Sequence, residues 1–96
     1  MRKIAIEHPA IVEIRVIGDA EAPDDDNLDV FVELNDGRCF SFTVFTPANV
    51  IRHMQGRLSF VSPGMLIVHR ITDEAIIEAV LDAYQLGIQQ FGVLQR

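Results

Sequence analysis

Eight carboxylate side chains and no basic one lie between Val16 and Gly37, and this cluster is the first feature of the chain that suggests chemistry. They are Asp19, Glu21, Asp24, Asp25, Asp26, Asp29, Glu33 and Asp36. The rest of the chain holds six acids and eight bases, so this one stretch produces the whole net charge of −6. Gathered carboxylates repel phosphate backbones and attract basic proteins. The charge argues against a nucleic-acid ligand, and it leaves two interpretations open: a surface for a basic protein, or a solvated loop.

The same carboxylates raise the question of a divalent cation, because oxygen-rich loops suit Ca²⁺ or Mg²⁺. Asp25, Asn27 and Asp29 stand at the first, third and fifth positions of an EF-hand loop, and Asp36 stands at the twelfth. The sixth position is Val30, where the motif needs a glycine for its sharp turn, and the segment reads as a strand. We therefore expect no metal and no cofactor.

The remaining candidates for a nucleophile, a base or a metal ligand are Cys39 and the histidines His8, His53 and His69. The histidines show no ligand spacing such as His-x-x-x-His, and Cys39 lies in no strained turn and at no helix N-terminus that would stabilise a thiolate. We expect Cys39 to be a half-exposed structural residue. Unless the fold brings these side chains together, the sequence predicts no catalytic residue and no enzyme.

The clearest structural unit is a β-hairpin of residues 28–34 and 38–45, preceded by an alternating strand at residues 10–17 and the acidic loop at residues 19–27. A two-residue turn would mix polar and apolar side chains on each face. A three-residue loop with a left-handed Gly37 separates them. Because a one-residue slip flips every side chain, burial should select the second register. It pairs Val32 with Phe40, Val30 with Phe42 and Leu28 with Val44.

A short helix should follow the hairpin, with Thr46 as its N-cap, Pro47 at its first position and Gly56 at its end. Its apolar residues are expected to face the core, and so are those of the loop at residues 57–63. They are Val50, Ile51 and Met54 in the helix, and Leu58, Phe60 and Val61 in the loop.

Residues 65–69 predict a fourth strand, and Thr72 caps a long C-terminal helix whose first turn is acidic. An apolar stripe at helical spacing marks its buried side, and Glu74, Glu78 and Asp82 mark its solvated side. The stripe consists of Ile76, Ile77, Val80, Leu81 and Tyr84. Gly87 should interrupt or end the helix, with residues 88–96 packing back as a tail.

The element order β-β-β-α-β-α predicts an α+β fold in a single domain of residues 1–96. It has one antiparallel sheet of about four strands with the short helix and the long C-terminal helix on one face. The single cysteine suggests a reducing compartment, and no apolar run approaches the length that spans a bilayer. We therefore expect a soluble, cytoplasmic protein that makes no membrane contact.

The other face of the hairpin should carry Asp29, Phe31 and Glu33 beside a strand that ends at Phe45. Phenylalanines among carboxylates are unusual on a purely solvated sheet face. They are explained either by a cover, formed by the N-terminal segment or the C-terminal tail, or by a recognition patch, in which aromatic anchors bury area and carboxylates meet Lys or Arg.

The run Phe40-Ser41-Phe42-Thr43-Val44-Phe45-Thr46-Pro47 resembles the immunity protein 8 family of bacterial polymorphic-toxin systems. The run Gly64-Met65-Leu66-Ile67-Val68 and the helix after it resemble that family too, and the similarity spans about residues 28–84. This chain lacks the tryptophan that the family carries after the helix start. The resemblance implies a non-enzymatic protein that binds and neutralises a cognate toxin.

The sequence therefore predicts a binding protein for a basic partner, which the resemblance suggests is a toxin domain. The predicted contact residues are Asp24, Asp25, Asp26, Asp29, Phe31, Glu33 and Phe45. The alternative is a small homodimeric structural or regulatory module joined by sheet edges or by the C-terminal helix, because exposed strand edges pair readily.

Overall fold

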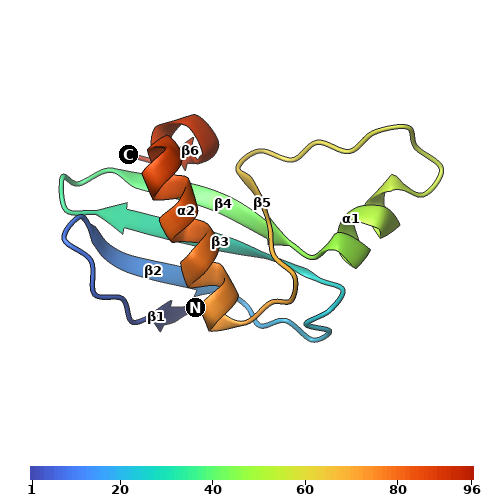
Figure 1. Cartoon of the computed structure of the whole chain (residues 1–96), viewed down its shortest axis with the longest axis horizontal. Coiled ribbons are helices and arrows are strands. Elements are labelled where there is room, and N and C mark those ends of the chain that lie inside the picture. The colour runs from blue at the N-terminus through green and yellow to red at the C-terminus, as the bar shows by residue number, and fades with distance from the viewer.

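The computed structural model describes all residues from 1 to 96 as one six-stranded sheet with two helices (Figure 1). The elements in chain order are β1 (Arg2–Ile4), β2 (Ile11–Ile17), β3 (Asn27–Leu34), β4 (Cys39–Phe45), α1 (Pro47–Met54), β5 (Met65–Ile67), α2 (Asp73–Phe91) and β6 (Val93–Leu94). The predicted α+β class and mostly antiparallel sheet are confirmed. The predicted number of strands is wrong, because β1 and β6 are too short to show an alternating pattern and are defined by their pairing partners.

The hairpin has the predicted register, with Val32 opposite Phe40, Val30 opposite Phe42 and Leu28 opposite Val44. Gly37 adopts a φ of +91°, which the three-residue loop requires and a side chain would resist. The sheet order is β1-β2-β3-β4-β5, and β6 also pairs with β4.

The pairing of β4 with β5 is parallel, which corrects the expectation of a purely antiparallel sheet. The long connection through α1 returns the chain to the middle of β4, where Met65 pairs with Thr43, so the two strands run in the same direction. β5 is also shorter than predicted and ends at Ile67. It forms one outer edge of the sheet.

One face of the sheet packs against α2, which lies across it in Figure 1. The core joins apolar strand residues to the buried side of the helix, where Ile76 and Val80 are fully enclosed. Ile77, Leu81 and Tyr84 of the predicted stripe are partly buried against it. Full burial of a large aliphatic side chain contributes roughly 1.5–3 kcal/mol. This face therefore provides most of the stability.

The other helix does not share that face, so the prediction of both helices on one face is wrong. α1 lies at the end of the sheet, and its one buried residue is the polar Asn49. The expectation that Ile51 and Met54 face the core is wrong as well, because both are exposed. In the following loop Leu58 and Val61 are also exposed rather than packed down.

The tail packs back as predicted, because residues after the Gly87 kink in α2 lead into β6 on the outer edge of β4. Gly92 permits this approach, since a Cβ there would lie 2.8 Å from the Phe42 ring. β5 and β6 thus occupy different halves of the same edge of β4. Neither helix has the length and apolar character that crossing a bilayer requires.

Candidate partner-binding surfaces

The acidic loop is held in place by Asp26. Its Oδ2 accepts a hydrogen bond from the backbone N–H of Glu21 at 3.1 Å, and its Oδ1 accepts one from Asn27 at 2.8 Å. The Asp26 N–H donates to Thr46 Oγ1 at 3.2 Å, which ties the loop to the start of α1. The Asp26 carboxylate therefore organises its own loop and is only partly available to a partner.

The two preceding carboxylates are paired with arginines distant in sequence. Asp25 forms an ion pair with Arg52 of α1 and accepts a hydrogen bond from Asn49 Nδ2 at 3.2 Å. Asp24 lies 3.2 Å from Arg70 Nε. Local neutralisation reduces the field that these two carboxylates present to solvent.

Other acids of the same stretch are paired too. Asp19 lies 3.4 Å from Arg2 Nε, and Asp36 lies 2.9 Å from Arg38 Nε. A hydrogen bond from the Arg38 backbone N–H is the main reason that the pKa of Asp36 lies below its ordinary value. Arginines from other parts of the fold thus offset part of the negative charge of the acidic segment.

The second face of the sheet, away from α2, carries the predicted residues Asp29, Phe31 and Glu33. Phe31 is half-buried, and Asp29 accepts a hydrogen bond from Thr43 Oγ1 at 3.0 Å without a cationic partner. Glu33 is paired with Arg96 Nη2 at 2.7 Å and with Arg15 at 3.5 Å. Of these three residues, Asp29 is the one acid without a cationic partner, and Phe31 is only half-buried. These two side chains therefore remain available to a partner.

Phe45 belongs to the same face but is 3 % exposed. Its ring packs edge-on against Phe60 at 5.3 Å and His53 at 5.9 Å, measured between ring centroids. At Phe45 the covering segment is thus α1 with the loop after it, whereas the C-terminal tail contacts the same face at Glu33 and Ser41. Phe45 anchors that segment and offers no exposed ring in this conformation.

Seven carboxylates have no cationic partner, and Arg57 is the one basic residue without an acidic partner. The seven are Glu7, Glu21, Asp26, Asp29, Glu74, Glu78 and Asp82. Three of them, Glu74, Glu78 and Asp82, follow one another at helical spacing on exposed positions of α2. We call these three the α2 acidic row. Its start lies close to the acidic loop, because the Ile71 N–H donates to Pro23 O at 2.9 Å.

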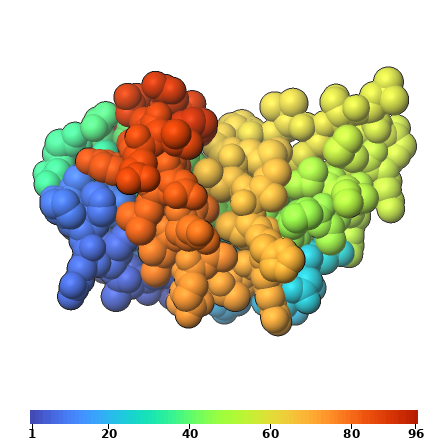
Figure 2. Space-filling view, in the orientation of Figure 1, coloured from blue at the N-terminus to red at the C-terminus, as the bar shows by residue number.

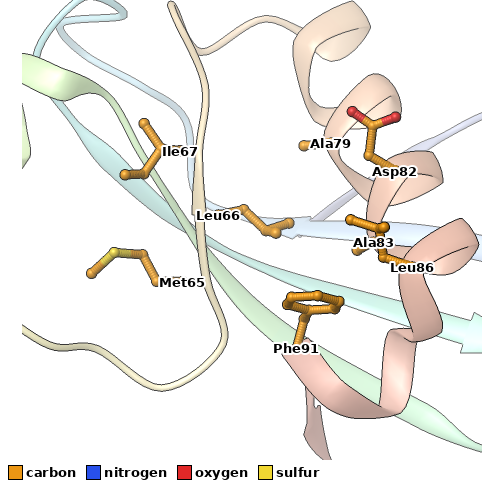
Figure 3. A pocket seen from close by; sticks show the side chains of 8 residues that line it. All are labelled: Met65, Leu66, Ile67, Ala79, Asp82, Ala83, Leu86 and Phe91. Carbon is orange, nitrogen blue, oxygen red and sulfur yellow. The ribbon is translucent and has the colours of Figure 1, made fainter.

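The acidic row leads to an apolar groove of about 370 Å³ between α2 and β5. Figure 3 shows Leu66 pointing from β5 toward Ala83 and Leu86 of α2, with Phe91 at one end and Asp82 at the rim. Figure 2 shows the two segments side by side on this surface of the molecule. Leu86 and Phe91 remain exposed although they are large and apolar. The sequence analysis did not predict this groove. The one sign of it in the sequence is that Leu86 and Phe91 are large apolar residues outside the predicted apolar stripe.

The cysteine and the histidines lie in separate surroundings. Cys39 is 1 % exposed, which corrects the expectation of a half-exposed thiol, and Arg15 Nη2 donates to its Sγ at 3.6 Å. His8 Nδ1 accepts hydrogen bonds from the N–H groups of Ala10 and Ile11, and its ring packs against Tyr84. These histidine contacts are structural, and no three His, Cys, Asp or Glu side chains are grouped as metal ligands would be.

Comparison with family models, with curated proteins and with solved structures found no match for this chain.

Proposed function

We propose that this protein is a non-enzymatic binding protein that holds a basic protein partner, the role that the resemblance to toxin-neutralising immunity proteins implies. The observation that carries the proposal is the set of seven unpaired carboxylates against a single unpaired arginine. Because all other charges are paired within the fold, this set accounts for the net charge of −6. Such a surface steers a basic partner toward it and raises the association rate.

Within that set, the α2 acidic row is the favoured contact. Like charges four residues apart on a helix destabilise it by roughly 0.2–0.5 kcal/mol per pair. The row contains two such pairs, Glu74 with Glu78 and Glu78 with Asp82. Lysines or arginines of a partner would relieve this repulsion, so the bound state gains more than an isolated ion pair would provide. Asp29 and Phe31 on the opposite sheet face form the second contact surface to test.

The test compares charge-reversed baits in affinity capture from a lysate of the source organism, washed at low and at high salt. Glu74→Lys with Glu78→Lys disrupts the row, and Asp29→Lys with Phe31→Ala disrupts the sheet face. Glu7→Lys with Glu21→Lys is the control, because it changes the net charge equally at two other unpaired carboxylates.

The proposal predicts one basic protein that elutes as salt rises, binds the control bait and is lost from the row variant. The captured protein is then purified and titrated against each variant by calorimetry. Equal affinity for the wild type and all three variants would show that these carboxylates do not form the contact. Loss from the sheet-face variant alone would move the contact to Asp29 and Phe31.

Self-association is the second candidate, because β5 forms an unprotected edge of the sheet and such edges pair with one another. Two copies with a net charge of −6 each repel, which favours the basic partner instead. Light scattering at rising salt separates the two: a dimer that strengthens as salt screens the repulsion supports self-association, and a constant monomer mass contradicts it.

A further inference from the structure

β5 has a free edge beside the groove. The Thr43 N–H donates to Gly64 O and the Val68 N–H donates to Phe45 O, so β5 uses alternate residues to pair with β4. In a parallel ladder the residues between them direct their backbone groups to the other side. The N–H and C=O groups of Met65 and Ile67 therefore point away from β4 toward an unoccupied edge.

The adjoining groove offers apolar area next to that edge. All of its lining residues except Asp82 are apolar. The small side chains of Ala79 and Ala83 keep α2 from filling the space above Leu66 (Figure 3). A volume of about 370 Å³ lies at the lower end of the roughly 300–1,000 Å³ range of ligand sites, so it suits one or two large apolar side chains.

The negative charge at the rim of the groove decides which kind of segment could bind there. Asp82 ends the α2 acidic row, and no arginine or lysine of this chain lies within ion-pair distance of it. A second copy of this chain would bring another acidic row and another net charge of −6 to the same place. A segment with lysine or arginine beside its apolar residues would instead compensate Asp82 and Glu78.

We propose that an extended segment of the basic partner adds to β5 as a further strand and places an apolar side chain in the groove between β5 and α2. This inference rests on the proposed function, and it names the contact through which the partner is held. Main-chain hydrogen bonds to Met65 and Ile67 provide affinity. The groove and Asp82 select an apolar residue followed by a basic one, in the manner of β-strand addition.

The test uses a short synthetic peptide in which valine alternates with lysine, followed by two-dimensional ¹H–¹⁵N NMR of the full chain. We expect shift changes concentrated at Met65, Leu66 and Ile67 and at Ala79 and Leu86, with binding that weakens as salt rises. A matched peptide with glutamate in place of lysine should not bind. Asp82→Lys should weaken the lysine peptide about two- to fivefold, as loss of one exposed ion pair implies.

Ile67→Pro separates strand addition from simple apolar contact. The proline removes an outward N–H that β4 does not use, and an edge strand tolerates it. Ile67→Thr is the control, because it shortens the same exposed side chain and keeps the N–H. The proline variant should lose the peptide, and the threonine variant, which loses only part of the apolar lining, should bind it more tightly than the proline variant does. If the proline variant melts early, a peptide N-methylated on the amides that face β5 tests the same hydrogen bonds on the wild-type chain.

Three results would overturn the inference. They are shifts centred on Phe31, equal binding of the N-methylated peptide, and concentration-dependent shifts at Met65 and Ile67 without peptide, which would assign the edge to a second copy. The proposed function fails separately, because it depends on the captured partner and the Glu74→Lys, Glu78→Lys variant. If that variant loses the partner while Ile67→Pro retains it, the proposal of a basic partner is supported and the proposal of strand addition at β5 is wrong.

Discussion

Replacing Thr46 by valine should loosen the acidic loop and α1 together. Thr46 is fully buried, and its Oγ1 accepts hydrogen bonds from the N–H of Asn49 at 3.3 Å and of Asp26 at 3.2 Å. Valine keeps the shape and removes the acceptor. Loss of the N-cap costs about 1 kcal/mol, and an unpaired N–H costs roughly 1–3 kcal/mol, so Thr46→Val should lower the free energy of unfolding by about 2–4 kcal/mol.

Thr72→Val is the matched control, because Thr72 caps α2 through the Ala75 N–H at 3.1 Å but is exposed and holds no loop. Thr72→Val should lower the free energy of unfolding by only about 1 kcal/mol. Urea unfolding followed by circular dichroism measures both variants, and with a slope of roughly 1–3 kcal/mol per molar the Thr46 midpoint should fall about 0.3–3 M below the Thr72 midpoint. Equal midpoints would refute the inference that Thr46 secures the loop.

Three shorter predictions follow from other contacts. Gly92→Ala places a methyl group 2.8 Å from the Phe42 ring, and thermal unfolding should show a loss of about 1–3 kcal/mol from overpacking; an unchanged melting temperature would contradict this. The hydrogen bond from Lys3 is the main cause that holds the pKa of Glu13 below its ordinary value of 4.5. Because that pKa is lowered on folding, the stabilisation is present above 4.5 and is lost as the pH falls through the folded value. Glu13→Gln should therefore be less stable than the wild type at neutral pH and equally stable in acid, and a gap that persists in acid would exclude this cause. The buried Cys39 should react with a thiol reagent at the rate of unfolding or local opening, whereas rapid labelling of the native protein would show an accessible thiol.

The hairpin and the helix caps could be predicted because their signals are local. Gly37 and the alternation of valines and phenylalanines select one register, and Thr46 and Thr72 both cap helices as expected. Such features depend on neighbouring residues and on the side-chain period of a strand. Contacts with distant segments therefore left the hairpin register and the helix caps as predicted.

The errors concern residues whose surroundings come from distant segments. Ile51 and Met54 have helical spacing, yet the buried position of α1 is the polar Asn49, and both apolar residues are exposed. Charge counting likewise could not show that Asp25 pairs with Arg52, which lies on an element far along the chain. The unpaired α2 row and the groove emerge only after such internal pairs are identified.

The outer edge of β4 has a consequence for the order of folding. β6 pairs with β4 at Phe40 and Leu94, more than fifty residues apart in sequence, and the Cys39 N–H donates to Arg96 O at 2.9 Å. During synthesis every other strand leaves the ribosome before this partner does. Until β6 is available, half of the edge of the apolar strand β4 has no partner. Contacts between residues far apart in sequence also form slowly. We therefore expect closure by β6 to be a late step, with the uncovered edge of β4 open to aggregation until it occurs.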